Sequence, residues 1–450
     1  MLQKFTNASV KIISKYLPDP YLFAVILTLI AFVLSWVFTG QSPVEITRNW
    51  GTGFWGLLAF SMQMVLVLVL GHTLAQAGPV KKTLVTIASI PKNPTQAIII
   101  VTLATAGTNM INWGFGLVTG ALLAKEMAKR VEADYRLLIA ASYSSFLFWH
   151  GGFSSSVALS LASAGTNFAV ITGGVIDAPI PITQTLFSPV NIALQVVLIT
   201  IVTFLNAKMH PKKKEDTVLI DKALLSDEPE VVKPSKNELT PAGKLEHSPL
   251  LSWIIGGLGM LFVVDHFIRN GFALDLNIVN FIFLIAAVLL HGTPARLLAA
   301  MSVAIKGAGS IVLQFPFYAG IMGIIGGANI YGVSLGGLMS DSFVNIATAQ
   351  TLPMFAFLSA GLLNIFVPSG GGQWALQAPI FFPAAYELGS DLVTVAMAIA
   401  WGDSWTNLLQ PFWALPALAV AGLGAKDIMG FLLMHTVIVG VVASVILVLF

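Results

Sequence analysis

The chain contains a series of long apolar stretches that carry almost no charge, and these constrain its fold more than any other feature. Segments such as 21–39 and 186–207 contain no Asp, Glu, Lys or Arg. About 20 apolar residues in a helix cross the roughly 30 Å hydrocarbon core of a bilayer. Only 10% of all residues are charged, whereas a soluble domain has about 25%. We therefore expect an all-α polytopic membrane protein.

Hydropathy predicts nine spans and two further apolar segments that are interrupted near their middle. The interrupted segments are 95–130, which breaks at 107–114, and 353–389, which breaks at 367–373. Each is either two crossings or one re-entrant helical hairpin, and the tips rich in Gly, Ser and Asn favour the hairpin. The nine spans are expected near 21–39, 54–77, 136–163, 186–207, 249–269, 277–291, 307–329, 392–420 and 427–449.

Basic residues set the expected orientation. Loops rich in Lys and Arg stay on the cytoplasmic side of a membrane. A cytoplasmic N-terminus places 21 of the 23 Lys and Arg residues on that side, and the C-terminus outside. The segment 208–248 is a solvated cytoplasmic linker, because 16 charged residues lie between Lys208 and Glu246. Regulatory or lipid-headgroup contacts through 212–214 are the alternative for it. The net charge of +2 gives no indication of nucleic-acid binding.

The two halves of the chain repeat the same features at an offset of about 254 residues. An Ala-Gly pair followed by Asn109 or Asn364 precedes each tip. After each tip, a long apolar helix leads to a span that polar residues interrupt, 136–163 in one copy and 392–420 in the other. Five crossings separate the copies, and an odd number inverts one relative to the other. Inverted repeats with broken helices in matching positions are typical of secondary transporters.

The broken segments supply groups that suit both an anion and a cation. Helix N-termini offer free N–H groups to a carboxylate, whereas unwound carbonyls and Ser, Thr or Asn oxygens suit Na⁺. Candidates for substrate contact are Asn112, Trp113, His150, Ser154, Ser155, Ser369, Gly370, Gly371, Gln373 and Thr406. Candidates for ion coupling are Thr108, Asn109, Ser156, Ser369, Asp403, Ser404 and Asn407, with Asn109, Asp403 and Asn407 as expected Na⁺ ligands.

Each candidate also has a structural alternative. The glycines need only shape a tight turn, the asparagines need only cap it, and serines in membrane helices often bond the preceding turn. His150 has a packing role as its alternative. Asp403 is the strongest candidate, because it is the only carboxylate well inside a predicted span and such an acid is expensive to bury.

The sequence offers no constellation for catalysis. The string from His150 to Ser154 is similar to an oxyanion loop with a nucleophile, but the Gly-x-Ser-x-Gly elbow and an acid partner are absent. Phosphate loops, metal-spaced His/Glu clusters and Cys are also absent. We expect no enzyme and no cofactor, apart from Na⁺ as a coupling ion.

Four strings resemble the short-chain fatty acid transporter family of bacterial inner-membrane carriers, which is associated with uptake of acetoacetate and butyrate. The resemblance covers nearly the whole chain except the linker. The strings are Asn112-Trp113-Gly114-Phe115-Gly116, Trp149-His150-Gly151-Gly152-Phe153-Ser154, Val367-Pro368-Ser369-Gly370-Gly371-Gly372-Gln373-Trp374 and Trp401-Gly402-Asp403-Ser404-Trp405-Thr406-Asn407.

This family looks like a branch of the ion transporter superfamily, which includes the divalent anion/sodium symporters. That resemblance implies a homodimer and an elevator mechanism. It implies a scaffold at 1–94 and 249–352, and a transport domain at 95–207 and 353–450. The symporters hold sodium at Ser-Asn-Thr tips, from which the tips of this chain depart. Protons therefore remain an alternative coupling ion.

We interpret the chain as a secondary carrier that imports short-chain monocarboxylates with a coupling cation. No Arg or Lys lies in any break, and a dicarboxylate usually needs such a fixed cation. The acyl tail is expected against Trp113, Phe153, Trp374 or Trp405. The alternatives are a carrier of the same fold for a dicarboxylate or an aminobenzoyl compound, and a channel.

Overall fold

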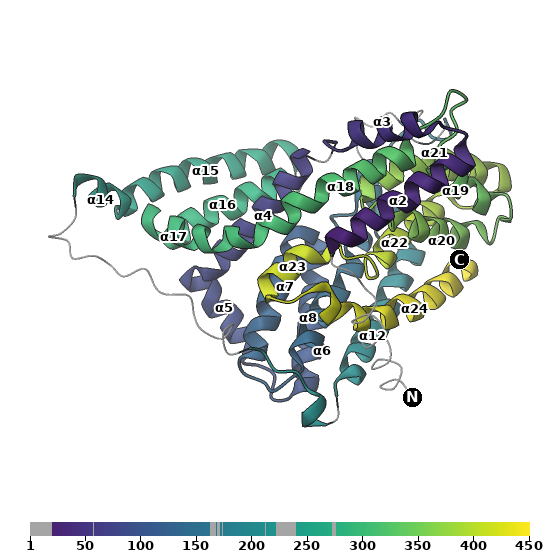
Figure 1. Ribbon diagram of the computed structural model, residues 1–450. Helices are drawn as coiled ribbons and strands as arrows, with labels where there is room; N and C mark the ends of the chain where they lie inside the picture. The colour runs from purple at the N-terminus through teal and green to yellow at the C-terminus, as the bar shows by residue number, and fades with distance from the viewer. Residues whose placement is uncertain are drawn as a thin grey trace.

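The computed structural model describes residues 20–450 except 57, 163–167, 169–171, 173, 212, 222–239 and 272–275. The N-terminus, predicted to be cytoplasmic, and residues 212 and 222–239 of the predicted linker 208–248 lie outside the described residues. The described region is almost entirely helical (Figure 1), with one isolated β-bridge between Ala328 and Ser334. The expectation of an all-α chain is thereby confirmed.

The helices follow the predicted apolar segments closely. In the first half they are α2 (Pro20–Thr39), α3 (Pro43–Gly53), α4 (Leu58–Gln76), α5 (Gly78–Ala88), α6 (Pro94–Ile111), α7 (Trp113–Ala128), α8 (Tyr135–Ser144), η1 (Ser145–Gly151), α9 (Ser156–Ala162), α11 (Ile182–Thr185), α12 (Pro189–Met209) and η2 (Lys214–Asp216). In the second half they are α14 (Pro241–Glu246), α15 (Pro249–Asn270), α16 (Leu276–His291), α17 (Pro294–Ala304), η4 (Ile305–Ala308), α18 (Gly309–Gly326), α19 (Leu335–Val344), α20 (Leu352–Asn364), α21 (Gly370–Leu388), α22 (Leu392–Thr406), α23 (Ala414–Ala421) and α24 (Ala425–Leu449).

Four of the described helices, α2, α12, α15 and α24, are each long and apolar enough to cross a membrane. Several shorter apolar helices accompany them, among them α16, α17 and α20. Helices satisfy their own backbone hydrogen bonds, which is the requirement for crossing hydrocarbon. The fold is therefore that of a helical, multi-pass membrane protein.

The four predicted interruptions are present in the structure. α6 and α7 are separated by Asn112 alone, and α20 and α21 by 365–369. The span predicted at 136–163 is divided into α8, the 3₁₀ helix η1 and α9, and the span at 392–420 into α22 and α23. Irregular backbone at membrane depth must be buried in protein or line a wet cavity. These breaks are therefore the candidate positions for a substrate or ion site.

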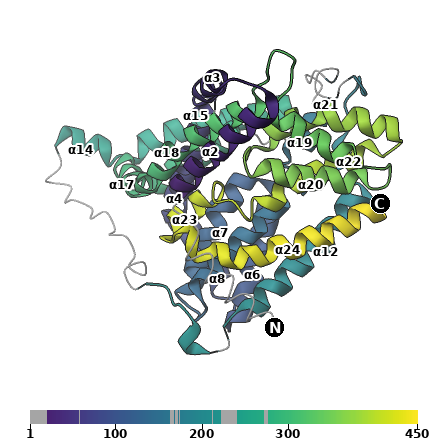
Figure 2. The ribbon, with the colours of Figure 1, turned by 45° about the vertical axis from the view of Figure 1, so that its right-hand side comes forward.

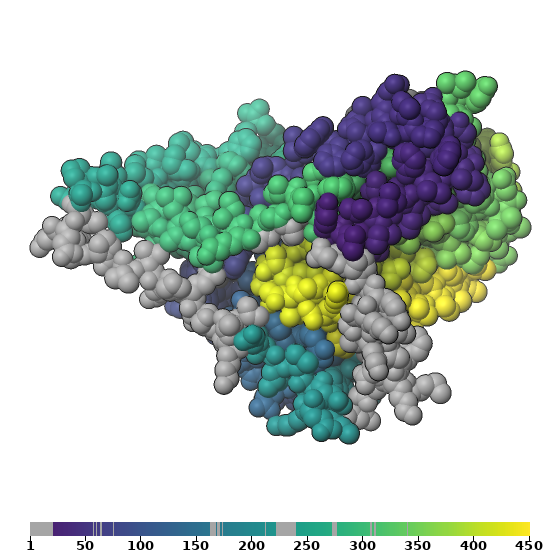
Figure 3. Space-filling view, in the orientation of Figure 1, coloured from purple at the N-terminus to yellow at the C-terminus, as the bar shows by residue number. Residues whose placement is uncertain are grey.

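Most helices belong to two groups, which also pack against each other, α4 and α5 against α7 and α19 against α20 and α21. In one group, α18 packs against α2 and α3, while α4 packs against α16 and α17. In Figure 3, α2 and α3 are the purple atoms that cover the upper right of the side facing the reader. In the other group, α6, α7 and α8 pack together and α20 packs along α22. α12 and α24 lie side by side in this group (Figure 2). All four breaks belong to the second group.

Candidate functional site

The break between α6 and α7 is held in place by the backbone and side chains of η1 and the turn after it. Asn112 caps α7, since its Oδ1 accepts the Phe115 N–H at 3.0 Å. Ser154 Oγ accepts the Trp113 N–H at 3.2 Å and donates to the Asn109 carbonyl at 3.3 Å. Two predicted substrate residues, Asn112 and Ser154, therefore shape this tip.

Asn109 lies just before this tip and is completely buried. Neither its Oδ1 nor its Nδ2 has a hydrogen-bond partner in the described region of the chain, and the same holds for the buried Thr105 Oγ1 one turn earlier. Buried polar atoms are nearly always satisfied, and an orphaned amide costs about 1–3 kcal/mol. Asn109 therefore carries two buried polar atoms that are unsatisfied within the described structure.

The break between α20 and α21 presents a helix N-terminus. Ser369 caps α21, because its Oγ accepts the Gly372 N–H at 3.2 Å. An added Cβ on Gly370 would overlap the His150 imidazole. The tip of the second hairpin therefore touches the broken span of the first half, and only a glycine allows this approach. A Cβ on Gly371 would meet nothing within 4 Å, so the space beside the helix terminus is open.

A polar cluster surrounds Asp403, which is 1% exposed. Asn364 Nδ2 donates to the Asp403 carbonyl at 2.9 Å, to Thr406 Oγ1 at 3.0 Å and to Asn407 Oδ1 at 2.8 Å. Asn407 Nδ2 donates to Asp403 Oδ1 at 3.3 Å. Asp403 Oδ2 and the buried Ser404 Oγ have no partner among the described residues. An intramembrane acid with a free oxygen requires a cation or a proton.

The cluster unites Asp403, Thr406 and Asn407 of the predicted set. Asn109, the third expected Na⁺ ligand beside Asp403 and Asn407, hydrogen bonds to none of them. Among the residues that the structure describes, no group of three or more His, Asp and Glu side chains could hold a metal ion. A cation at Asp403 would therefore depend on amide, hydroxyl and carbonyl oxygens.

Other predicted residues serve the local fold. Thr108 Oγ1 donates to the Ala104 and Thr105 carbonyls of its own helix, and Ser155 Oγ accepts the Ala158 N–H at 3.2 Å. Gln373 Nε2 donates to the Ala360 carbonyl at 2.9 Å, which ties α21 to α20. Ser156 begins α9 and is half-buried.

Aromatic rings join the two halves beside His150. Trp113, at the start of α7, lies 4.9 Å from Trp413, the last residue of the break in the second broken span. Trp149 stacks on Phe146 at 5.8 Å and contacts Trp113 at 6.2 Å. These distances between ring centroids are those of favourable aromatic pairs. The arrangement provides an apolar wall next to the α21 N-terminus.

Two expected contacts for an acyl tail lie elsewhere. Trp405 stacks on Phe357 at 4.7 Å and donates to the Thr436 carbonyl, so it belongs to the packed interior. Phe153 is 50% exposed and contacts Phe187 at 6.3 Å. The tail contacts we favour are therefore Trp113 and Trp149.

Sequence reasoning missed several residues that build the site. Asn191 of α12 donates to the Gly151 carbonyl at 3.0 Å and accepts from Trp401 Nε1 at 2.8 Å. Asn364 organises the Asp403 cluster, although the sequence marked it only as a member of the repeat. The indole Nε1 atoms of Trp149 and Trp374 are buried without a partner among the described residues. Asn191 could have been predicted as a site residue, because it is a polar residue inside the apolar span 186–207.

The whole chain, residues 1–450, matches the model of the short chain fatty acid transporter family. A relative from Escherichia coli strain K12 is 44% identical over 451 residues, covering 100% of both chains. A relative from Haemophilus influenzae is 43% identical over 434 residues, covering 96% of both. Both are provisionally named short-chain fatty acid transporters.

These matches define a helical membrane transporter rather than an enzyme. The chain belongs to the short-chain fatty acid transporter family. A solved structure of the YdaH transporter of Alcanivorax borkumensis aligns with a TM-score of 0.44 and 17% identity, covering 96% of this chain and 98% of that one. That similarity is too low to add to the assignment.

Proposed function

We propose that the protein imports short-chain monocarboxylates, such as butyrate or acetoacetate, together with a coupling cation. The observation that carries this proposal is the open space at Gly371, beside the N-terminus of α21 and next to His150. Helix N–H groups bind a single carboxylate without a fixed cation. The aromatic wall of Trp113 and Trp149 suits a short acyl chain.

The coupling ion is proposed to bind at Asp403. A monoanion that moves inward opposes the membrane potential at about 2.3 kcal/mol per 100 mV, and one cation offsets this cost. Asp403 Oδ2 and Ser404 Oγ are buried without a partner among the described residues, and carboxylate and hydroxyl oxygens are suitable Na⁺ ligands. Protonation of Asp403 is the alternative, because its Oδ2 is buried and free in the described structure.

We further propose an elevator mechanism in a homodimer of the bacterial inner membrane, with the N-terminus in the cytoplasm. The support is that most helices belong to two groups and that all four breaks belong to one of them. The scaffold would comprise 1–94 and 249–352, and the moving transport domain 95–207 and 353–450. An inverted repeat supplies this transport domain with a pair of equivalent gates.

Uptake into liposomes tests the substrate. Purified protein is reconstituted with an imposed Na⁺ or proton gradient, and labelled butyrate is competed with acetoacetate or succinate. We expect butyrate and acetoacetate to compete at least about tenfold better than succinate, because no Arg or Lys neutralises a second carboxylate. Stronger competition by succinate would contradict the monocarboxylate proposal and favour a dicarboxylate carrier.

A matched pair of substitutions tests the position. Gly371→Ala adds a methyl group in the open space at the tip, and Gly257→Ala adds one in open space on α15. Neither added Cβ meets another atom, so both variants should fold. We expect Gly371→Ala to raise KM for butyrate about tenfold and Gly257→Ala to leave it unchanged. Equal KM values for the two variants would place the carboxylate elsewhere.

A further inference from the structure

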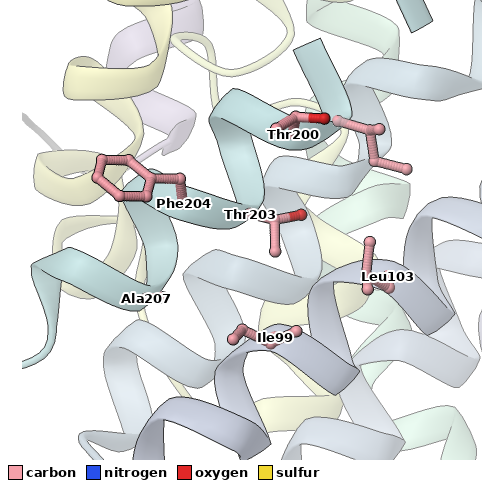
Figure 4. A pocket seen from close by; sticks show the side chains of 7 residues that line it. Ile99, Leu103, Thr200, Thr203, Phe204 and Ala207 are labelled. Carbon is pink, nitrogen blue, oxygen red and sulfur yellow. The ribbon is translucent and has the colours of Figure 1, made fainter. Parts of the chain in front are cut away.

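A second site lies outside the breaks, in a groove between α6 and α12. Its cavity measures about 360 Å³, within the range of about 300–1,000 Å³ for pockets that bind small molecules. Figure 4 shows the side chains that line it. The lining residues are Ile99 and Leu103 from α6 and Ile199, Thr200, Thr203, Phe204 and Ala207 from α12.

The groove has the chemistry of an acyl-chain site. Its lining is mostly aliphatic, and α12 is one of the helices long and apolar enough to cross the membrane. Leu103 and Phe204 are 45% and 58% exposed, so the groove opens to the surroundings of the protein. Since α12 is expected to cross the membrane, we infer that these surroundings are lipid. An apolar groove that faces lipid is filled by a lipid chain rather than by water.

A cation stands at the end of the groove where α12 terminates. Lys208 Nζ lies 5.5 Å from the centre of the Phe204 ring, beside Ala207. It is exposed and forms no ion pair with any described residue. Lysines near the cytoplasmic surface attract anionic lipid headgroups. The positive charge of Lys208 therefore favours an anionic ligand over a neutral one.

A polar atom lies deeper in the same groove. Thr203 Oγ1 is buried and has no hydrogen-bond partner among the described residues. Thr203 and Lys208 are five residues apart on one helix, a rise of about 7.5 Å. The polar region of one leaflet, which contains the phosphate and the ester carbonyls, is about 5–7 Å thick. The spacing of Thr203 and Lys208 along α12 therefore matches the thickness of the layer that contains the ester carbonyls and the phosphate of a phospholipid.

We propose that this groove binds one anionic phospholipid. An acyl chain lies between α6 and α12, the Thr203 hydroxyl turns toward the groove to donate to an ester carbonyl, and Lys208 binds the phosphate. A long-chain fatty acid offers only one polar layer, so its carboxylate at Lys208 would leave a methylene group against Thr203. The two polar positions therefore favour the phospholipid. This site is independent of the proposed substrate site.

Native mass spectrometry of the purified, delipidated protein tests this proposal. The protein is titrated with phosphatidylglycerol, phosphatidylcholine of the same chains, or palmitate. We expect phosphatidylglycerol to bind several-fold more tightly than the other two. Lys208→Gln should reduce the preference for phosphatidylglycerol over phosphatidylcholine about fivefold, since one lysine contributes that much near a membrane surface. Thr203→Val should weaken both phospholipids and leave palmitate unchanged.

Filling the groove provides the second arm. Ala207→Trp should abolish high-affinity binding of both phospholipids. Leu258→Trp, which adds bulk to the exposed face of α15, should leave it intact. The melting temperatures of the variants verify that they fold. Unchanged binding in Ala207→Trp would overturn the site, unchanged preference in Lys208→Gln would overturn the headgroup contact, and equal binding of palmitate would identify a fatty-acid groove instead.

Discussion

The two copies of the repeat share a frame of capped helices. Each copy has a hairpin whose second helix begins at a polar cap, Asn112 for α7 and Ser369 for α21. Each then has a broken span whose first helix begins at an aspartate, Asp134 for α8 and Asp391 for α22. Caps satisfy the free N–H groups of a helix start, so these four positions fix where the helices begin.

The copies differ in the asparagine that precedes each tip. Asn364 donates to three oxygens of its own copy, whereas Asn109 makes no side-chain hydrogen bond in the described structure. Asn364 thus completes a network that contains Asp403. Asn109, by contrast, is buried with both amide atoms unpaired among the described residues. The two copies therefore share the same helix caps but surround the preceding asparagine with different polar groups. The second copy is organised around an acid, whereas in the first copy both polar atoms of the asparagine lack a partner among the described residues.

The largest expected effect concerns the orientation of the copies, which are inverted only if an odd number of crossings separates them. We expect Lys244→Cys, in the exposed helix α14, to react with an impermeant thiol reagent only from the cytoplasmic side. Phe450→Cys should react only from the outside. The chain has no other Cys to obscure the result. Labelling of both positions from one side would mean that the copies are not inverted as proposed.

Much of this frame could be predicted from the sequence. Apolar length locates spans because hydrocarbon thickness fixes it. Polar strings located three of the breaks, whereas the string 401–407 lies mostly within α22 and the break follows at 407–413. The network around Asn364 could not be predicted, because it depends on contacts between residues about 40 positions apart. The contact of Gly370 with His150 joins segments from opposite halves. Single-sequence patterns specify helices, but they do not specify which polar groups meet.

Asp403 provides the next largest effect, since only the second copy carries an acid in its break. Asp403→Asn should reduce gradient-driven accumulation by at least about tenfold, because the variant has no charge to share with a cation. Exchange of labelled for unlabelled butyrate should survive at a reduced rate. The two assays are performed on the same liposomes. Unchanged accumulation by Asp403→Asn would contradict coupling at Asp403 and would place the coupling site at Asn109 instead.

A pair of nearly isosteric substitutions compares the two asparagines directly. Asn364→Leu leaves the oxygens of Asp403, Thr406 and Asn407 without their donor. We expect it to lower the free energy of unfolding by about 2–3 kcal/mol. Asn109→Leu removes two unsatisfied atoms and should change the free energy by less than about 1 kcal/mol.

The same pair separates stability from transport. Asn109→Leu should abolish ligand-dependent stabilisation if the free amide contacts substrate or ion, although the fold is intact. The readout is the melting temperature in detergent with and without butyrate and Na⁺. An equally large loss of stability in both variants would show that Asn109 is structural, and the contrast between the copies would disappear.

The smallest effect comes from the caps of the broken spans. Asp391 in the second copy bonds only locally, to the amide and hydroxyl of Thr394 at 2.7 and 2.6 Å. Asp134 in the first copy is fully buried and accepts from the Val218 N–H and from Arg136, both at 3.0 Å. Its own N–H donates to Nε2 of His210 at 3.2 Å. The first cap therefore includes a histidine that must be neutral.

This histidine makes the cap of the first copy sensitive to mild acid. Burial lowers the pKa of His210 below its ordinary value of 6.5, although the Pro211 backbone and the Asp134 charge oppose the shift. Below pH 6.5 the unfolded chain binds a proton that the folded chain resists, so stability falls as the pH falls from 6.5 toward the lowered pKa. His210→Gln cannot titrate, and its melting temperature should vary less between pH 7.5 and 5.5 than that of the unsubstituted protein. Thr394→Val, which loosens the second cap, should leave the pH dependence unchanged. Identical pH dependence in His210→Gln and the unsubstituted protein would show that the cap of the first copy does not sense protons.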